Sequence, residues 1–340
     1  MNTISDYLQI EQRRYIGCKA KLTDWIFNIV KTEAPSAKSF CDIFAGTGIV
    51  ASRAIPLYEK VIINDFLISN NIIYKAFFEQ GEFDMSRIVG ILTDFNAVDA
   101  RDLDDNYFSR SFGGKYYDYA TAKRIGYFRQ SIEDLKNSVS EKEYCILIAT
   151  LIYNIDRIAN TLGHFDAYIK KDIKPQDLKL RPINAQSHKN VSIFREDSNR
   201  LARSISMDVT YIDPPYNSRQ YSRFYHLYET LVKWDAPELF GVALKPKPEN
   251  MSDYCTTKAV KAFEDLIMNL DTRTIVVSYN NTYDSKSTSS ENRISLEDIK
   301  TILNKRGETH TFEHTHPYFN AGKTEFNNHK EFLFVTKTYE

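Results

Sequence analysis

The segment Val209-Thr210-Tyr211-Ile212-Asp213-Pro214-Pro215-Tyr216 carries the most structural information in this sequence. Its apolar, β-prone first half predicts a buried strand. The two prolines cannot continue a sheet ladder, so the chain has to leave the sheet directly after Asp213. Each proline also holds the residue before it in extended geometry. We therefore expect a short rigid shelf at the carboxyl end of a strand, where open α/β sheets bind their ligands.

The shelf carries three groups that together suit a planar amine. The carboxylate of Asp213 and the carbonyl of Pro214 can both accept hydrogen bonds from an exocyclic amino group. The ring of Tyr216 can stack on a flat heterocycle, which is worth about 1–3 kcal/mol for a nucleobase. These groups predict a pocket for a base that has been rotated out of its helix. A plain turn after a strand is the alternative, because Asp and Pro are common turn residues.

Length and composition are those of an ordinary globular protein. The chain has 340 residues, of which 42% are hydrophobic and 26% are charged, enough for a full-sized core and two domains. No apolar run is long enough to cross a bilayer and no signal segment opens the chain, so we expect a cytoplasmic protein without membrane association. The four cysteines are scattered, which indicates neither a disulfide framework nor a zinc site. Because the net charge is −1, binding to DNA requires basic residues concentrated on one face.

A second motif, Asp42-Ile43-Phe44-Ala45-Gly46-Thr47-Gly48, predicts a strand, a glycine turn and a helix. Its glycines allow the backbone to approach a ligand closely. The pattern also fits a dinucleotide-binding fingerprint, with Asp65 near the spacing of the ribose-binding acid, so a nicotinamide or flavin enzyme is an alternative here. Asp42 within the strand favours a cofactor that carries an ammonium group instead. Asp65, which follows the strand at 61–64, can accept both ribose hydroxyls or cap the next helix.

The amino-terminal motif is Tyr15-Ile16-Gly17-Cys18-Lys19, followed by a helical pattern. The helix is indicated by an apolar stripe at Leu22, Trp25, Ile26, Ile29 and Val30. A lysine near a helix start is unfavourable against the helix dipole. We therefore expect Lys19 either to meet an anionic ligand or to be a solvated surface lysine.

These motifs, in this order, resemble those of D12-class DNA adenine-N6 methyltransferases, which include the Dam-type enzymes and the methylases of some type II restriction systems. Asp213-Pro214-Pro215-Tyr216 is similar to the family's catalytic motif. The resemblance implies an α/β, Rossmann-like methyltransferase fold with a mixed seven-stranded sheet and helices on both faces. It also implies S-adenosylmethionine as the cofactor and S-adenosylhomocysteine as the product. The implied cofactor-binding residues are Tyr15, Lys19, Asp42, Phe44, Ala45, Gly46, Gly48, Asp65 and Asp197, although Asp197 is equally plausible as a helix cap.

The middle of the chain breaks the alternation of strands and helices. We expect a catalytic domain over residues 1–80 and 191–340 and an inserted, mainly helical target-recognition subdomain over 81–190. Basic and aromatic residues alternate in the insert, which suits phosphates and bases, although a solvated charged face is the alternative. After the shelf, two arginines lie off the apolar stripe of a predicted helix and are expected to meet phosphates. The predicted DNA-binding residues are Lys123, Arg124, Arg129, Arg219 and Arg223.

Seven segments predict strands, which supports a mixed sheet covered by helices. They lie near Phe40, Ile63, Ile193, Thr210, Val276, Phe312 and Leu333. No metal is expected, because the histidines at 310, 314 and 316 have no evident fourth ligand and methyl transfer requires none.

The sequence thus predicts a site-specific enzyme that moves a methyl group from S-adenosylmethionine to N6 of a flipped-out adenine in double-stranded DNA. The resemblance implies the methylase of a restriction-modification system, with the restriction endonuclease acting as a separate protein. One alternative is an amino-methyltransferase that acts on cytosine N4 or on RNA. Another is a non-catalytic DNA-binding protein on the same fold, against which the intact motifs around Asp213, Asp42 and Lys19 argue.

Overall fold

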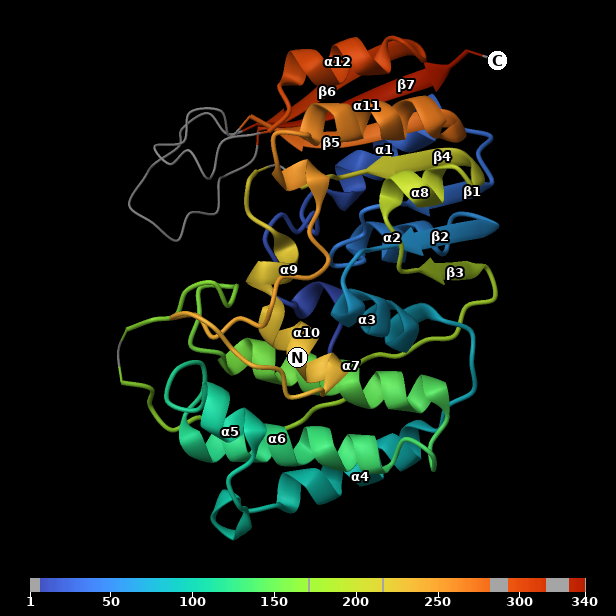
Figure 1. Ribbon diagram of the computed structural model, residues 1–340. Coiled ribbons are helices and arrows are strands. Elements are labelled where there is room, and N and C mark those ends of the chain that lie inside the picture. Colours follow the sequence, from blue (N-terminus) through green and yellow to red (C-terminus); the bar gives the residue numbers. More distant parts are fainter. Residues whose placement is uncertain (1–6, 171, 216, 282–292, 316–329, 340) are drawn as a thin grey trace. The chain divides into compact units, whose positions relative to one another are not determined.

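The computed structural model describes residues 7–170, 172–215, 217–281, 293–315 and 330–339. The chain divides into two compact units (Figure 1). The sheet unit comprises Lys19–Phe66, Asn190–Tyr221 and Asn250–Glu340, and the helical unit comprises Met1–Cys18, Leu67–Lys189 and Ser222–Glu249. Each unit is described by itself.

The sheet unit is built on a seven-stranded sheet in the order β3-β2-β1-β4-β5-β7-β6. All neighbouring pairs from β3 to β5 are parallel, whereas β7 runs antiparallel to both β5 and β6. This confirms the predicted mixed sheet and each of the seven predicted strands. The strands are β1 (Ser39–Asp42), β2 (Lys60–Asn64), β3 (Val191–Phe194), β4 (Ser206–Ile212), β5 (Asp271–Asn280), β6 (Gly307–Thr315) and β7 (Lys330–Thr338).

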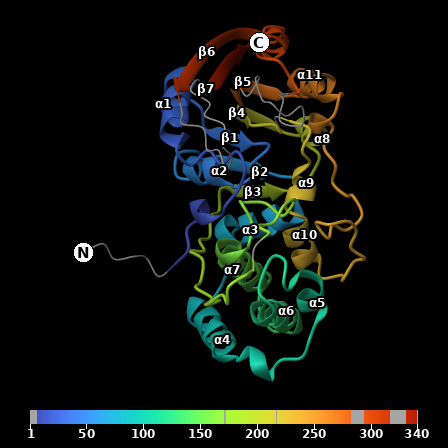
Figure 2. The ribbon, with the colours of Figure 1, turned by 90° about the vertical axis from the view of Figure 1, so that its left-hand side faces the viewer.

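Helices cover both faces of this sheet, as expected. Figure 2 shows α1 (Thr23–Glu33) and α2 (Ile49–Ala54) on one side, with α8 (Ser198–Ala202) and α11 (Ala259–Asn269) on the other. Successive side chains of a strand point to opposite faces, and β1 illustrates this. The ring of Phe40 packs 5.5 Å from that of Phe27 in α1, whereas Cys41 belongs to the core beneath α8 and α11. The β-strand, glycine turn and helix predicted from residue 39 onward are therefore present.

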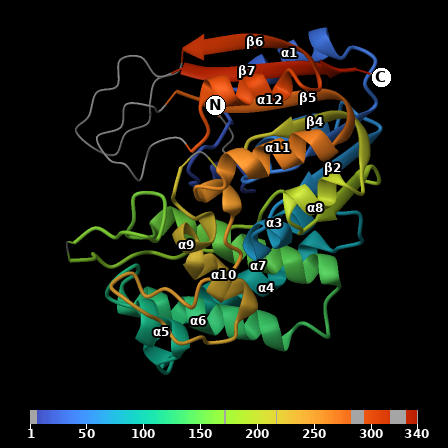
Figure 3. The same cartoon turned by 45° about the horizontal axis from the view of Figure 1, so that its top comes forward.

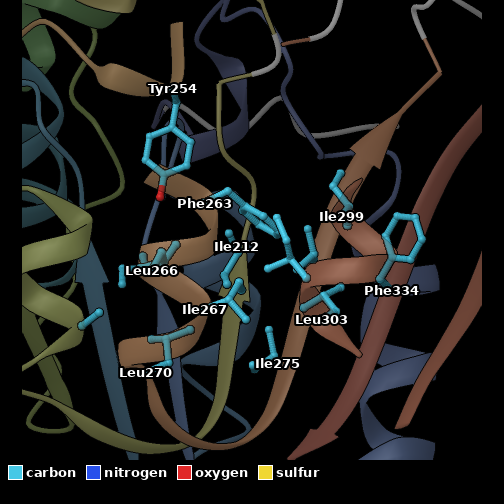
Figure 4. Packing of buried hydrophobic residues seen from close by; sticks show 14 of the residues in the cluster. Ile212, Tyr254, Phe263, Leu266, Ile267, Leu270, Ile275, Ile299, Leu303 and Phe334 are labelled. Atoms are coloured by element: carbon cyan, nitrogen blue, oxygen red, sulfur yellow. The ribbon is translucent and has the colours of Figure 1, made fainter. Parts of the chain in front are cut away.

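The core beneath α11 and α12 (Leu296–Leu303) fixes the strands that lead to the shelf (Figures 3 and 4). Ile212 at the end of β4 and Ile275 in β5 are fully buried against Phe263, Leu266 and Ile267 of α11. Each such side chain contributes about 1.5–3 kcal/mol when it is fully buried. The end of β4 is therefore anchored directly before Asp213.

The helical unit contains long helices with local sequence signals. In α7 (Glu141–Ile158), for example, Ser140 and Glu143 form a reciprocal capping box, which satisfies amide groups of the first turn. The unit includes the predicted insert 81–190 together with further segments, and target recognition by it stays a prediction. Its helices are η1 (Ile10–Gln12), α3 (Ile68–Phe78), α4 (Met85–Ala97), η2 (Ala100–Asp102), α5 (Tyr107–Phe112), α6 (Tyr119–Asp134), α7 and α10 (His226–Lys233), while α9 (Tyr221–Phe224) begins in the sheet unit.

Three further observations concern the described part of the chain. None of its helices is both long and apolar enough to cross a membrane. No group of three or more His, Cys, Asp or Glu side chains in it is placed to hold a metal ion, and His316 lies outside it. Its four cysteines are free thiols, of which Cys41, Cys145 and Cys255 are buried.

Candidate active site

Three carboxylates lie at or directly after the carboxyl ends of three adjacent strands. Asp42, the last residue of β1, is in register with Ile63 of β2 and with Tyr211 of β4. Two residues beyond those partners, the chain reaches Asp65 and Asp213. The strand order reverses at β1 and β4, and such a switch point is where open α/β sheets bind ligands. The topology thus gathers the acids of three separate sequence motifs at one edge.

Lys19 is a buried lysine that forms an ion pair with Asp213 of the shelf. Its Nζ lies 3.0 Å from Oδ2 of Asp213, and the two side chains are only 3% and 16% exposed. A buried ammonium is costly unless it is paired with an anion, and the carboxylate meets that requirement. The alternative of a solvated surface lysine is therefore wrong. The predicted contact of Lys19 with the cofactor stays a prediction.

Asp42 is a buried carboxyl group whose ionised form is disfavoured by its surroundings. It is 1% exposed, and its Oδ2 accepts a hydrogen bond of 3.1 Å from the amide of Ala51. Its buried Oδ1 has no hydrogen-bond partner among the described residues. Burial raises the pKa of Asp42 well above its ordinary value, and the nearby carboxylates of Asp213 and Asp65 raise it further, against the opposing effect of the Ala51 amide. An acid in this state suits a cationic ligand, which would stabilise its ionised form.

The glycine turn is held by Asp65. Gly46 and Gly48 have φ angles of 52° and 78°, in the left-handed region that glycine enters without steric cost. The amide of Gly46 donates a hydrogen bond of 2.9 Å to Oδ2 of Asp65. The amide of Ala45 donates to the carbonyl of Asn64 at 2.9 Å. Asp65 therefore shapes the loop after β1, and binding of a ribose by it stays a prediction.

Asn64 is a positioning residue that the sequence reasoning missed. It is fully buried, and its amide nitrogen donates to the carbonyls of Ile43 and Glu196, each at 3.1 Å. Its side-chain oxygen accepts the amide of Glu196 at 3.0 Å. Asn64 thereby fixes the loops that follow β1 and β3. The sequence feature that could have identified Asn64 is a polar side chain at the end of an apolar strand. Such a side chain is expected to be buried, and a buried amide has to find hydrogen-bond partners.

Two predicted cofactor residues have observed structural contacts. Asp197 is exposed and accepts a hydrogen bond of 3.1 Å from the amide of Arg200, so it caps α8, as its alternative interpretation expected. Phe44 is half-buried, and its ring meets that of Tyr254 edge-on at 5.0 Å. The cofactor contacts of both residues stay predictions.

The chain after Asp213 is supported by a segment that the sequence reasoning did not identify. Pro214 is buried and Pro215 is half-buried, while Tyr216 lies outside the described residues. The side chain of Gln220 donates to the carbonyl of Ser252 at 2.9 Å and accepts its amide at 2.7 Å. The thiol of Cys255 donates to the carbonyl of Arg219 at 3.4 Å. The short helix η3 (Asp253–Cys255) thus holds the end of the shelf.

Arg129, a predicted DNA-binding residue, is buried in the helical unit and forms hydrogen bonds there. It is 1% exposed, and its Nε and Nη2 donate to the carbonyls of Leu231 and Val232 at 2.7 and 3.1 Å. Its guanidinium also pairs with Glu133 at 2.9 Å. These contacts satisfy carbonyls at the end of α10, which have no partner within the helix. Arg129 therefore presents no exposed cation to a phosphate.

The other predicted basic residues are half-buried, and each described contact lies within one unit. Lys123 donates to the carbonyl of Leu103 at 3.2 Å, and Arg124 donates to that of Leu178 at 2.8 Å. Arg223 donates to the carbonyl of Pro246 at 2.7 Å. Their contacts with DNA stay predictions, as does that of Arg219.

Tyr15 lies in the helical unit, whereas Lys19 belongs to the sheet unit. Its ring stacks on that of Tyr225, with centroids 4.5 Å apart and planes 7° apart. The guanidinium carbon of Arg13 lies 4.8 Å from the centroid of the Tyr15 ring. Tyr15 is thus held within its own unit, and its contact with the cofactor stays a prediction.

Comparison with known proteins agrees with this arrangement. The chain is 31% identical over 338 residues to the type II methyltransferase M.NlaIII of Neisseria lactamica, which covers 93% of this chain and 95% of that protein. It is 33% identical to the type II methyltransferase M.FokI of Planomicrobium okeanokoites and 34% identical to the modification methylase StsI of Streptococcus sanguinis, over 88% and 85% of this chain. It spans only about half the length of those two relatives, at 48% and 46%. A family profile matches residues 15–302, so the chain belongs to the family of D12 class N6 adenine-specific DNA methyltransferases.

Proposed function

We propose that this protein transfers a methyl group from S-adenosylmethionine to N6 of an adenine extruded from duplex DNA, within a short recognition sequence. The observation that carries the proposal is the group of Lys19, Asp213 and Asp42 at the edge of the sheet. It combines an acid paired with a lysine, beside the two prolines, with a buried acid of which one oxygen has no hydrogen-bond partner among the residues that the structure describes. The first suits an exocyclic amine and the second suits an ammonium group.

The residues around Asp42 fit the cofactor's chemistry. Asp42 would bind the ammonium of the methionine part through Oδ1, and this charge would offset the repulsion from Asp65 and Asp213. The turn at Gly46 and Gly48 has no side chains to obstruct a ligand. When bound, S-adenosylmethionine supplies the methyl group as an electrophile on its sulfonium sulfur.

The shelf would prepare the adenine amine for attack. Its lone pair is delocalised into the ring, so the amine is a poor nucleophile. Hydrogen bonds from both N6 hydrogens to the Asp213 carboxylate and the Pro214 carbonyl favour a pyramidal nitrogen with an available lone pair. Asp213 then holds the proton that N6 loses once the new N–C bond forms. Tyr216 would stack on the base, and fixed alignment of the reactants supplies much of the remaining rate.

The relatives support a biological setting as well. M.NlaIII and M.FokI are named type II methyltransferases. We infer that this chain modifies the sites of a restriction-modification system and that a separate endonuclease cleaves the same sites when they are unmethylated. The acids and the glycine turn that the proposed chemistry uses come from the sheet unit.

The test is transfer of labelled methyl from S-adenosylmethionine to unmethylated duplex DNA of mixed sequence, followed by nucleoside analysis and mapping of the modified positions. We expect label in N6-methyladenine at one short motif. Label in N4-methylcytosine would overturn the choice of base, and label only in RNA would overturn the substrate class.

The matched variants are Asp213→Asn and Asp213→Ala. The asparagine keeps the size of the side chain but presents a weaker acceptor and cannot take a proton. Both variants should lose nearly all transfer while the binding of S-adenosylhomocysteine, measured by calorimetry, stays within about threefold of wild type. Full turnover by either variant would remove Asp213 from the mechanism.

A further inference from the structure

Two surface loops of the helical unit expose large apolar side chains at their tips. Leu162 is 61% exposed in the loop 160–169, and Val242 and Phe240 are 73% and 45% exposed in the hairpin 240–245. Single exposed apolar residues are common on protein surfaces. Here three of them lie on two loops that are linked to each other, and exposed apolar side chains gathered in one region often mark a binding surface. We call the two loops together the double loop.

The loop 160–169 is closed at its base, so Leu162 is presented by a defined structure. The side-chain amide of Asn160 donates to the carbonyls of Lys115 and Ile169, at 2.9 and 3.0 Å. The amide of Ile169 donates back to the carbonyl of Asn160 at 3.2 Å. Next to Leu162, Gly163 has a φ of 101°, which allows the tight turn at the tip. Phe165 is 1% exposed and anchors the loop in the unit.

The hairpin is fastened to this loop. The hydroxyl of Tyr116 lies within hydrogen-bond distance of the carbonyls of Phe165 and Ala243, at 2.7 and 2.9 Å. Lys245 forms an ion pair with Asp166 across the two loops. The two loops are therefore linked to each other within the helical unit (Figure 1).

Cations lie at the base of the double loop, where Lys115 also donates to the carbonyl of Val242 at 2.6 Å. Lys115 and Lys170 line an open pocket of about 530 Å³ at the base of the loop 160–169, together with the ring of Tyr168. The Nζ of Lys115 lies 5.2 Å from the centroid of that ring. Lys247 is exposed beyond the hairpin. Asp172 also lines the pocket, Asp166 is paired with Lys245, and Glu249 beyond the hairpin is paired with Lys233. An apolar tip above a cationic base complements the bases and phosphates of a nucleic acid.

We infer that the double loop contacts duplex DNA and that Leu162 is the wedge that enters the base stack when the target adenine is extruded. Lys115 and Lys170 hold the adjoining phosphates, while the closed base of the loop keeps the leucine rigid against the stack. Apolar wedges of this kind offset part of the cost of unstacking a base pair. The inference rests on the proposed function, because it concerns the extrusion of the adenine that is methylated.

Contact is tested by photocrosslinking, which needs no methyl transfer. The photoreactive residue p-benzoylphenylalanine replaces Leu162 in one variant and Leu57 in another. Leu57 is a matched control, because it is 57% exposed and lies in the sheet unit. We expect crosslinks to duplex DNA from position 162 and none from position 57. Equal yields, or none from position 162, would overturn the contact.

The wedge role is tested with Leu162→Ala on two duplexes that carry the mapped site. On the fully paired duplex, kcat/KM should fall about 10- to 100-fold, since the cost of extrusion is a few kcal/mol. On a duplex in which the target adenine faces an abasic site, most of the loss should disappear. Leu57→Ala should match wild type on both. An equal loss on both duplexes, or no loss on either, would overturn the wedge role.

A base-extrusion signal separates this inference from the proposed function. With 2-aminopurine at the target position, wild type should raise the fluorescence on binding, and Leu162→Ala should reduce that rise several-fold. If wild type transfers no methyl group to DNA, the proposed function fails, while crosslinking, which needs no mapped site, still decides whether Leu162 contacts the duplex. An unchanged rise in the variant counts against the wedge.

Discussion

The Nζ of Lys19 lies 3.0 Å from Oδ2 of Asp213, inside a part of the sheet unit where the lysine is 3% exposed. The pair joins the segment before α1 to the shelf after β4. It also places a positive charge beside a group of three acids, of which Asp42 is the most deeply buried. Lys19 therefore stabilises the negative charge of Asp213, in addition to any contact with a cofactor.

Replacing Lys19 with methionine should impair methyl transfer more than folding. Methionine fills a similar volume but leaves Asp213 without this charge-assisted hydrogen bond, which is worth about 1.5–3 kcal/mol. We expect kcat/KM to fall about 10- to 100-fold in a methyl-transfer assay. Lys21→Met is the matched control, because Lys21 is exposed in the same segment. Similar rates for the two variants would show that the ion pair is not used in catalysis.

Binding of S-adenosylmethionine should release a proton from Asp42. Burial and neighbouring acids raise the pKa of this carboxyl, so the free protein retains its proton to higher pH than a solvated aspartate does. A bound ammonium favours the ionised form. The affinity for the cofactor should therefore increase with pH, and calorimetry in buffers of different ionisation enthalpy should detect the released proton.

Asp42→Asn provides the control for that experiment. The asparagine cannot ionise, so its binding of S-adenosylmethionine should be weaker and should lose the proton release. A raised pKa also means that the wild type loses stability as pH rises from about 4 through the pKa of the folded state. The asparagine variant should gain stability relative to wild type over that range in denaturant unfolding. Proton release that persists in Asp42→Asn would assign the titration to another group.

Arg129→Ala should destabilise the protein without a specific loss of DNA affinity. The guanidinium is 1% exposed and supports two carbonyls at the end of α10 as well as Glu133. Leaving such partners unsatisfied should reduce the free energy of unfolding by about 2–3 kcal/mol. Lys136→Ala, which removes a more exposed partner of the same Glu133, should cost less than about 0.5 kcal/mol. A large fall in DNA affinity of the folded Arg129 variant would support its predicted role as a DNA ligand.

The protein should lose stability in acid through His226, which supports the loop 160–169 of the helical unit. This side chain is fully buried, and its Nε2 lies 3.2 Å from the carbonyl of Phe165 in the loop 160–169. Burial lowers the pKa of His226 to about 4, below the value of about 6.5 in the unfolded chain. The unfolded state therefore binds more protons between these values, and stability falls as pH drops from about 6.5 to about 4, by about 3 kcal/mol at most. His226→Asn should flatten this dependence in denaturant unfolding, and an unchanged slope would contradict the assignment.

The strands and the glycine turn could be predicted from the sequence because their signals are local. Apolar runs that end at Asp42, Asp65 and Asp213 became β1, β2 and β4, and the turn after Asp42 carries positive φ angles at Gly46 and Gly48. The predicted surface alternative for Lys19 failed for a different reason. Nothing within its own segment indicates that it pairs with an acid almost two hundred residues later in the chain.

The sequence by itself therefore determined the order of the motifs, the seven strands and the glycine turn, since each depends on neighbouring residues and on hydrophobic periodicity. Only the tertiary structure decided which charges are buried together and which surface is exposed. Asn64 proved to connect two loops, Arg129 proved to be internal, and Leu162 proved to be exposed. Burial and pairing are set by contacts between distant segments, and a linear pattern does not contain those contacts.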